Sequence, residues 1–413
     1  MNRLWQSLAR LSLFTALVSG PAICQADVLY SVTDLGTLGG DYIYVSGINN
    51  RGEVVGNCTT NGLNVMHAFV YSGGSLADLG TLGGTNSYGY GINDSGQVVG
   101  AAYTGSDQDD AFLYSGGSMS DLGALGGSGG DARAINNHGQ IAGGAWTSSD
   151  AELHAYLYSG GTMTDLGTLG GTRSQAFGIN DSGQVVGRAS VSGIADYHAF
   201  LYSGGAMTDL GTLGGTLSYA YGINNTGQVV GVAYTNNSIQ HAFLYSGGVM
   251  ADLGTLAGGY QSVAYGINSE GQIVGWSDAS DAQQHAFVYE DGRMTDLNTE
   301  IDTNTGWYLE MATAINDGGQ IVGIGAHATN VLRAFLLTPY PVLQISATSS
   351  NAIQIQFTAQ ASTGYLIESR DSLSSGAWQT LLVLDPIASI HTVVITDSLL
   401  PGRPARFYRV RSS

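Results

Sequence analysis

Residues 219–256 read YAYGINNTGQVVGVAYTNNSIQHAFLYSGGVMADLGTL, and this stretch contains every element that the chain repeats. Alternating and β-branched residues in it predict four short strands, Tyr219 to Asn224, Gln228 to Tyr234, Ala242 to Tyr245 and Met250 to Leu256. Glycine-containing turns join the first strand to the second and the third to the fourth, and glycine supplies the positive φ that a tight hairpin needs. One such sheet cannot bury both of its faces alone, so several must pack together.

The same unit occurs seven times. Asp-Leu begins at Asp34, Asp78, Asp121, Asp165, Asp209, Asp252 and Asp296, in steps of 44, 43, 44, 44, 43 and 44 residues. Ile-Asn also occurs seven times, followed each time by Gly-x-x-x-Gly and then by an alanine-aromatic pair. A period of this length indicates a repeat architecture in which each unit is one supersecondary structure.

The phase of the repeats predicts a closed ring. The first copy begins at Leu29 to Leu35, which corresponds to a fourth strand, and six complete copies follow. The last copy supplies only three strands, Ala312 to Asn316, Gln320 to Gly325 and Arg333 to Leu337. The two fragments complete one unit, so we predict an all-β, seven-bladed β-propeller closed by N- and C-terminal strands that share one blade. The alternative is an open β-solenoid.

The motifs also resemble a known family. His-Ala-Phe-Leu-Tyr-Ser-Gly-Gly, Thr-Asp-Leu-Gly-Thr-Leu-Gly-Gly and Gly-Ile-Asn-Asp-Ser-Gly-Gln-Val-Val-Gly resemble the bacterial extracellular HAF-repeat family over residues 29–338. The resemblance implies an exported repeat protein, and it brings no catalytic residues to carry over. The entry to blade seven departs from the pattern, because Asp-Leu-Asn replaces Asp-Leu-Gly there and a longer loop follows.

Composition excludes several classes of protein. The 413 residues include 62 glycines and no lysine, and the net charge is −19. Glycine disfavours long helices, because it costs about 1 kcal/mol against alanine inside a helix. With so few cations to neutralise phosphates, nucleic-acid binding is not expected as a main role.

The N-terminus has the pattern of an export signal. Residues 1–26 combine Arg3 and Arg10 with an apolar stretch and a small residue, Ala26, where cleavage is expected. No later stretch of about 20 apolar residues exists, so no transmembrane segment is expected. We therefore expect a secreted protein, extracellular or associated with the cell surface. After cleavage Cys58 is the single cysteine, and we expect it to be buried.

A second domain is predicted after residue 339. Residues 27–339 carry 6 arginines and 28 acidic residues, a net charge of −22, whereas residues 340–413 carry 5 arginines and 4 acidic residues. This shift supports a boundary between a propeller over 27–339 and a small domain over 340–413. Alternating strands and the ending Arg-Phe-Tyr-Arg-Val resemble a fibronectin-type-III-like β-sandwich, which implies an adhesive or spacer role.

Candidate binding residues are sought where the copies differ, because variable positions on a rigid scaffold commonly bind ligands. If the strand containing Tyr219 is innermost, the positions four residues before each repeated isoleucine ring the mouth of the channel. Blades three and four then bring arginines, a carboxylate and an amide towards the irregular blade seven. The predicted ligand-binding set is Tyr44, Tyr88, Asp131, Arg133, Arg173, Gln175, Tyr219, Trp307 and Glu310. The alternative is that blade seven is irregular only because the ring closes there.

No nucleophile motif, phosphate loop or metal motif is present, so no catalytic residue, cofactor or metal is expected. Five histidines recur at one equivalent position, too far apart around a ring to share a metal, and we expect them to bond backbone groups: His67, His154, His198, His241 and His285. The repeated aspartates are expected to satisfy backbone donors at turns. Two acidic loops, with Asp107, Asp109 and Asp110 in one and Asp278 and Asp281 in the other, lack a full calcium ligand set.

The leading hypothesis is a secreted, non-catalytic binding or adhesion protein whose ligand is a carbohydrate or an extracellular protein. The alternative is a propeller polysaccharide hydrolase or lyase in which Asp131 and Glu310 act as acid and base across the channel. A third hypothesis is a matrix protein with no small ligand.

Overall fold

A computed structural model describes residues 29–60, 65–105, 108–192, 196–328, 331–341, 344–349, 352–359, 364–370, 378–386, 391–398 and 407–412. The expected export signal, residues 1–26, lies outside them. The chain divides into two compact units. One comprises Val32–Thr299 and Thr303–Leu337, and the other contains Thr338–Ser413 together with Glu300–Asp302 and the chain up to Ser31.

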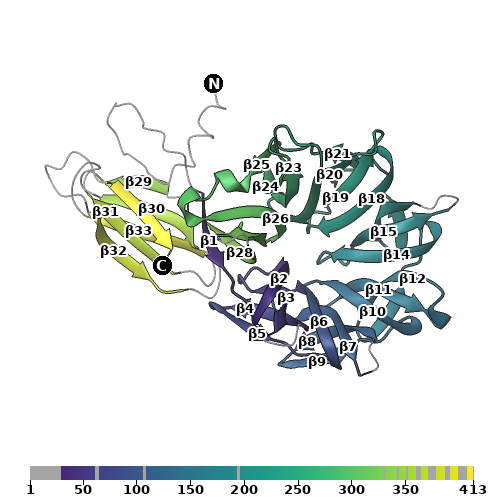
Figure 1. Cartoon of the computed structure of the whole chain (residues 1–413). Helices are drawn as coiled ribbons and strands as arrows, with labels where there is room; N and C mark the ends of the chain where they lie inside the picture. Colours follow the sequence, from purple (N-terminus) through teal and green to yellow (C-terminus); the bar gives the residue numbers. More distant parts are fainter. Residues whose placement is uncertain are drawn as a thin grey trace. The chain divides into compact units, whose positions relative to one another are not determined.

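The larger unit is a ring of seven four-stranded antiparallel sheets (Figure 1). The innermost strands are β2 (Gly39–Ile48), β6 (Gly83–Ile92), β10 (Gly126–Ile135), β14 (Gly170–Ile179), β18 (Gly214–Ile223), β22 (Ser262–Ile267) and β26 (Trp307–Ile315). The second strands are β3 (Val54–Thr60), β7 (Val98–Thr104), β11 (Ile141–Thr147), β15 (Val185–Val191), β19 (Val229–Thr235), β23 (Ile273–Asp278) and β27 (Ile321–His327). The third strands are β4 (Met66–Ser72), β8 (Asp109–Ser115), β12 (Leu153–Ser159), β16 (Tyr197–Ser203), β20 (Gln240–Ser246), β24 (Gln284–Glu290) and β28 (Val331–Pro339). The outermost strands are β5 (Ser75–Asp78), β9 (Ser118–Asp121), β13 (Thr162–Asp165), β17 (Ala206–Asp209), β21 (Val249–Asp252), β25 (Arg293–Asp296) and β1 (Tyr30–Asp34).

The two ends of the repeat region share blade seven. Its strand order is β1-β28-β27-β26, so the first strand of the chain completes the last blade, beside β28 in Figure 1. Each innermost strand contacts its two neighbours around the ring, including β2 against β26. The prediction of a seven-bladed propeller closed by shared strands is therefore confirmed, as is the assignment of the Tyr219 strand as innermost.

The strand boundaries differ from the predicted ones in a regular way. In blade five the innermost strand β18 begins at Gly214, before the predicted Tyr219, and the outermost strand β21 ends at Asp252 rather than at Leu256. The early end has a local cause. The Asp252 carboxylate accepts a hydrogen bond of 2.7 Å from the Gly254 amide, which turns the chain out of the sheet.

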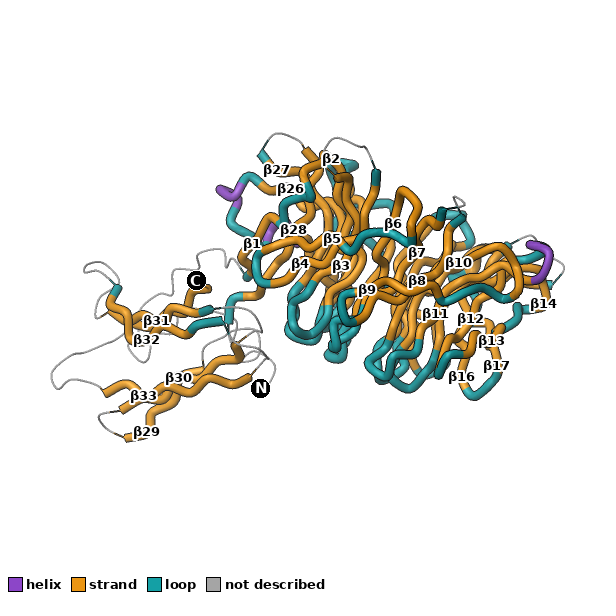
Figure 2. The backbone as a smooth tube through the Cα atoms, turned by 90° about the horizontal axis from the view of Figure 1, so that it is seen from below, coloured by secondary structure: helices purple, strands orange, loops and turns teal. Residues whose placement is uncertain are grey.

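The hydrophobic core lies between neighbouring blades. Ala142 and Ala155 of blade three pack against Val185 and Phe200 of blade four in one buried cluster, and equivalent clusters recur around the ring. In Figure 2 strands make up most of each blade and loops join them. Because both faces of a sheet are covered by its neighbours, each blade depends on the ring for burial.

The second glycine of each Gly-x-x-x-Gly element allows a close backbone approach. A Cβ at Gly100 would clash with the carbonyl oxygen of Tyr88 and with the ring of Phe112. The first glycine, Gly96, has a φ of +76°, which the hairpin turn requires. In the Gly-x-x-x-Gly element, the first glycine is therefore needed for the hairpin turn and the second for close packing of the backbone.

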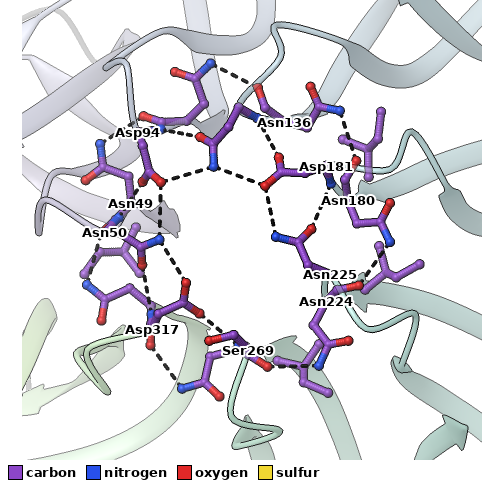
Figure 3. A pocket seen from close by; sticks show the side chains of 18 of the residues that line it. Asn49, Asn50, Asp94, Asn136, Asn180, Asp181, Asn224, Asn225, Ser269 and Asp317 are labelled. Carbon is purple, nitrogen blue, oxygen red and sulfur yellow. Dashed lines mark hydrogen bonds between the residues drawn. The ribbon is translucent and has the colours of Figure 1, made fainter.

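Seven buried asparagines link the blades into a closed hydrogen-bonded ring at the end of the channel where the innermost strands finish. Each Nδ2 donates to the backbone carbonyl of the equivalent asparagine in the next blade, at 3.0–3.1 Å. The members are Asn49, Asn93, Asn136, Asn180, Asn224, Asn268 and Asn316, several of which are labelled in Figure 3. The last link, from Asn316 to Asn49, closes the ring.

Each of these asparagines also closes its own hairpin. Asn180 Oδ1 accepts from the amides of Ser182 (3.1 Å) and Gln184 (3.0 Å), and its Nδ2 also donates to Gln184 Oε1 (2.8 Å). Asn180 is 4% exposed, so water does not readily replace these partners. One side chain thus fixes a turn and joins two blades.

We predict that Asn180→Ala lowers the free energy of unfolding by about 2–4 kcal/mol, because it removes from a buried position the acceptor of two turn amides and the bond to the next blade. Urea unfolding followed by circular dichroism measures this loss. Ser182→Ala is the matched control. Ser182 is exposed, and the substitution keeps its backbone amide, which donates to Asn180. A loss equal to that of the control would show that the ring does not stabilise the fold.

The smaller unit holds two three-stranded sheets. One has the order β29 (Gln344–Ser349), β30 (Ala352–Ala359), β33 (His391–Ser398), and the other β32 (Gln379–Leu384), β31 (Tyr365–Arg370), β34 (Phe407–Ser412). Residues of both sheets form one buried cluster, in which the rings of Phe357 and Tyr365 meet edge to face at 5.4 Å. The predicted small β-sandwich is therefore present.

Two further predictions concern single features. Cys58 is fully buried, as expected, in the core cluster between blades one and seven, and burial raises the pKa of its thiol. Within the described residues, no helix has the length and apolar character needed to cross a membrane.

Candidate functional site

The channel has a polar ring at its hairpin end, around a cavity of about 180 Å³ (Figure 3). The residues after the seven asparagines form this ring: Asn50, Asp94, Asn137, Asp181, Asn225, Ser269 and Asp317. Six of them alternate between amide and carboxylate, and Ser269 takes the odd seventh place. Alternation keeps each carboxylate beside amide donors rather than beside another carboxylate.

The polar groups of this ring are largely bonded to one another. Asp94 accepts from the backbone and side-chain amides of Asn50 (2.8 and 3.2 Å) and from the side chain of Asn137 (3.1 Å). Burial raises the pKa of Asp181, but hydrogen bonds from Asn137 and Asn225 outweigh it and hold the pKa below its ordinary value. No group of three or more candidate metal ligands lies close enough to bind an ion in the described parts of the chain. The hydrogen bonds of the ring join the hairpins of neighbouring blades.

A second cavity, of about 240 Å³, opens on the channel wall where blades two, three and four meet. Its lining is Tyr88, Tyr90, Ala101 and Asp109 of blade two, Gly130, Asp131, Arg133, Gly144, Trp146 and Leu153 of blade three, and Gln175 of blade four. Aromatic, charged and amide side chains converge in it. Such a mixture is typical of small-ligand sites, in which apolar surface supplies affinity and a few polar groups supply orientation.

Asp131 is the centre of the polar side of this cavity. Its Oδ2 accepts from Arg133 Nε at 2.7 Å and from Gln175 Nε2 at 3.0 Å, and the Arg133 guanidinium is 2.6 Å away in an ion pair. Its Oδ1 accepts from the backbone amide of Gly144 at 3.0 Å. The carboxylate is therefore held in one orientation by groups from two blades.

Aromatic rings form the other side. Tyr88 and Tyr90 stack with their centroids 6.5 Å apart and their planes 8° from parallel. The guanidinium of Arg133 lies over Tyr90, 4.2 Å from the ring centroid. Burial raises the pKa of Tyr90 to about 12, with the charge of Asp131 adding to it and Arg133 opposing it. Tyr90 is therefore a neutral hydroxyl at physiological pH.

Blade four continues the site with two arginines. The Arg188 guanidinium lies over the rings of Phe177, Tyr197 and Tyr219, at 5.7, 5.0 and 5.2 Å from the centroids. Its Nη2 also donates to Gln175 Oε1 at 3.2 Å, which connects it to the Asp131 network. Arg173, which is exposed, lies over the indole of Trp146 at 5.9 Å.

The structure groups six of the nine predicted residues. Tyr88, Asp131, Arg133 and Gln175 line the cavity itself. Arg173 contacts the lining residue Trp146, and Tyr219 contacts Arg188. Side-chain contacts connect five of them: Tyr219 to Asp131 through Arg188 and Gln175, and Tyr88 to Asp131 through Tyr90 and Arg133, whereas the Arg173 guanidinium contacts Trp146. All six belong to the wall rather than to a rim, because positions such as Tyr88 fall in the middle of the innermost strands.

The other three predicted residues do not line this cavity. Trp307 stacks on His327, with centroids 4.7 Å apart and planes 7° from parallel. Glu310 belongs to blade seven, and partial burial raises its pKa. Tyr44 of blade one is 40% exposed, and its pKa is raised by burial and by Tyr265.

The sequence interpretation missed Tyr90, Trp146 and Arg188, and it assigned Asp109 to an acidic loop rather than to the binding site. Tyr90 stands two residues before the repeated isoleucine, in a column that also contains Phe177, Tyr221 and Tyr265. This repeated aromatic position could have identified Tyr90 as a candidate binding residue. Arg188 stands where other blades have residues such as Ala101 or Gly144, so comparing the copies strand by strand would have identified it.

The five recurrent histidines do not bond backbone groups as predicted. In every case Nδ1 bonds the aspartate of the Asp-Leu motif, for example His154 to Asp165 at 2.8 Å. The reason is geometric, because the histidine on the third strand and the aspartate on the fourth lie near each other across the hairpin. The same aspartates accept from the amide two residues later, which confirms the predicted turn role.

One acidic loop contains Asp107, Asp109 and Asp110, and the second contains Asp278 and Asp281. Asp107 lies outside the described residues, as do residues 61–64 and 193–195 of the variable loops. Partial desolvation raises the pKa of the exposed Asp109, and the charge of Asp131 adds to the effect. In the second loop Asp281 is 3.1 Å from His285 in an ion pair rather than in a calcium ligand set.

His285 makes stability depend on pH. Burial lowers the pKa of His285, but hydrogen bonds to Asp296 and Asp281 outweigh this and raise the pKa above its ordinary value. A raised pKa in the folded state stabilises the fold below the unfolded pKa of about 6.5, and this stabilisation is lost as pH rises through the folded pKa.

We predict that His285→Gln lowers unfolding free energy more at about pH 5.5 than at about pH 8.5. Paired urea titrations measure the difference. Asp281→Asn tests the cause, because it should lower the His285 pKa measured by NMR. An unchanged His285 pKa in that variant would show that Asp281 does not stabilise the protonated imidazole of His285.

No family model and no curated protein matches this chain. Among solved structures, the chain is similar to a puromycin-hydrolyzing peptidase of Mycobacterium tuberculosis, with 10% identity and a TM-score of 0.49 over 82% of this chain and 62% of that one. It is also similar to the β-propeller domain of the Trilobed protease of Pyrococcus furiosus (9% identity, TM-score 0.47, 72% of this chain, 97% of that one). A third likeness is to the Aleuria aurantia lectin, a six-bladed propeller that recognises fucose (14% identity, TM-score 0.30, 71% and 93%). This chain thus spans less than two thirds of the length of the peptidase, and likenesses this distant do not bear on its function.

Proposed function

We propose that this protein is an exported, non-catalytic binding protein that holds a carbohydrate on the channel wall of blades two to four. One observation carries the proposal: the oriented Asp131 carboxylate and the stacked rings of Tyr88 and Tyr90 line the same cavity. Aromatic faces pack against the apolar faces of sugar rings, while fixed acceptors and donors bond the hydroxyls. Tyr90, Arg133 and Gln175 supply the donors.

The rest of the chain is consistent with a role outside the cell. Residues 1–26 have the composition of an export signal, and the HAF-type motifs resemble those of extracellular proteins. The sandwich after residue 339 would act as a spacer or an adhesive module, as the fibronectin-type-III-like resemblance implies. Secretion is tested by fractionating the producing cells and locating the protein by immunoblot, and recovery from the cytoplasm alone would contradict it.

We predict that Tyr88→Ala and Asp131→Asn each weaken carbohydrate binding at least about tenfold, a loss of 1.4 kcal/mol. The first removes a stacking face and the second removes the charge that orders Arg133 and Gln175. Binding is measured by a glycan array followed by calorimetry on the best ligand. Tyr42→Ala is the matched control, because Tyr42 is 66% exposed on blade one and does not line the cavity.

Equal loss in Tyr42→Ala would place the binding surface elsewhere. If no glycan binds, the carbohydrate proposal fails and an extracellular protein partner becomes the hypothesis to test. Unfolding midpoints of all three variants must match that of the parent protein, so that lost binding is not lost folding.

A second candidate function is glycoside hydrolysis, favoured by one observation. Asp109 and Asp131 line the same cavity, and the pKa of Asp109 is raised while Asp131 is paired with Arg133. Two carboxyl groups in unlike environments suit a proton donor and an ionised partner. Glu310, which the sequence suggested as the partner of Asp131, is not in this cavity.

We predict for this candidate that Asp109→Asn abolishes release of reducing sugar, because it removes the proton donor. Reducing-end assays on the glycan that binds best measure it, with Asp110→Asn on the same strand as control. No release by the parent protein would leave binding without hydrolysis.

A further inference from the structure

The positive charge of the propeller is concentrated in one place. Residues 27–339 carry a net charge of −22 and contain six arginines. Three of the six, Arg133, Arg173 and Arg188, lie on the inner strands of blades three and four, in or beside the cavity. Two carboxylates, Asp109 and Asp131, line the cavity with Arg133, and Asp110 and Glu152 stand next to lining residues in the sequence, so the three arginines lie among carboxylates.

The three arginines are not equivalent. Arg133 is compensated by Asp131, at 2.6 Å. Arg188 is held by three aromatic rings and by Gln175, and no carboxylate among the described residues lies within ion-pair distance of it. Arg173 likewise has no ion pair with a described residue, and its guanidinium lies against Trp146. The guanidinium groups of Arg173 and Arg188, both on blade four, therefore have N–H donors that no described carboxylate occupies.

A guanidinium held beside aromatic rings is well suited to bind an oxyanion. Its planar fork can donate two parallel hydrogen bonds to a carboxylate or a sulfate, and contacts with the rings reduce the side-chain entropy lost on binding. The cation–π contacts hold the charge beside the rings without neutralising it. The neighbouring Trp146, Tyr197 and Tyr219 offer further ring surface beside the charge.

We propose that the cavity takes an acidic carbohydrate, with anionic groups of the sugar chain bound separately by Arg188 and by Arg173 and a sugar ring packed towards Tyr88 and Trp146. This inference rests on the proposed carbohydrate-binding function and names its ligand class. Elsewhere the propeller is acidic and repels anions, so the arginine-bearing wall of blades three and four is where such a ligand is attracted. A peptide rich in acidic side chains lacks the apolar ring faces that the aromatic residues would pack against.

The test compares ligands that differ only in charge. The full chain is titrated calorimetrically with a tetramer of galacturonic acid and with its methyl ester, which has the same backbone without the carboxylates. We expect the acid to bind at least about tenfold more tightly than the ester. A sulfated oligosaccharide forms a third arm, and tighter binding of it than of the acid would identify sulfate as the anionic group within the same class.

Variants assign the effect to the arginines. In Arg188→Gln and Arg173→Gln the preference for acid over ester should fall towards one. Arg293→Gln is the matched control, because it removes the same charge from an exposed position on the outermost strand of blade six and should keep the full preference. Unfolding midpoints check that each variant is folded.

The outcomes separate the two proposals. Equal binding of acid and ester by the parent protein overturns the acidic-ligand inference and leaves carbohydrate binding intact. Binding of poly-glutamate as tight as that of the acid tetramer also overturns it, because charge alone would then suffice. Binding to no sugar, neutral or acidic, overturns both the inference and the proposed function on which it rests.

Discussion

The structure depends on one repeated hydrogen bond, from a buried asparagine side chain to the backbone carbonyl of the equivalent asparagine in the next blade. Each link, such as that from Asn180 to Asn224, joins a buried side-chain amide to a carbonyl that also accepts from the amide of its own turn, at Gly227. The seventh link, from Asn316 to Asn49, closes the circle between the last blade and the first. At the outer edge of that last blade, β1 pairs with β28 and joins the two ends of the repeat region. Hairpin geometry and blade packing therefore meet in the asparagine side chains, and strand pairing joins the termini.

Repetition accounts for the scaffold, and departures from it account for the candidate site. The cavity forms where blades two to four place dissimilar residues at equivalent positions, such as Tyr88, Asp131 and Gln175. Taken singly, each of these side chains is only a difference between one repeat and the others on an innermost strand. Together they form a network, because the ring places the strands of neighbouring blades side by side. At the hairpin end the copies are alike or alternate, and there the polar groups largely satisfy one another.

The sequence interpretation succeeded in proportion to how local each signal was. The turn role of the repeated aspartates and the burial of Cys58 followed from short-range chemistry and are confirmed. The histidine partners were wrong, because the contact between His154 and Asp165 depends on strand register across a hairpin. Trp307 and Glu310 were expected at the site from their place in an irregular loop, yet neither lines the cavity. Arg188 was missed because its importance comes from three rings on two blades.

The sequence alone determined the all-β class, the number of blades and the sharing of the last blade between the termini. It could do so because strand alternation, turn glycines and repeat phase are written along the chain and are sampled seven times. Only the tertiary structure decided which side chains share a cavity and which arginines lack a carboxylate partner. Those facts depend on distances between residues some 44 positions apart, such as Asp131 and Gln175, and such distances are set by the angle and spacing of neighbouring blades rather than by any local pattern.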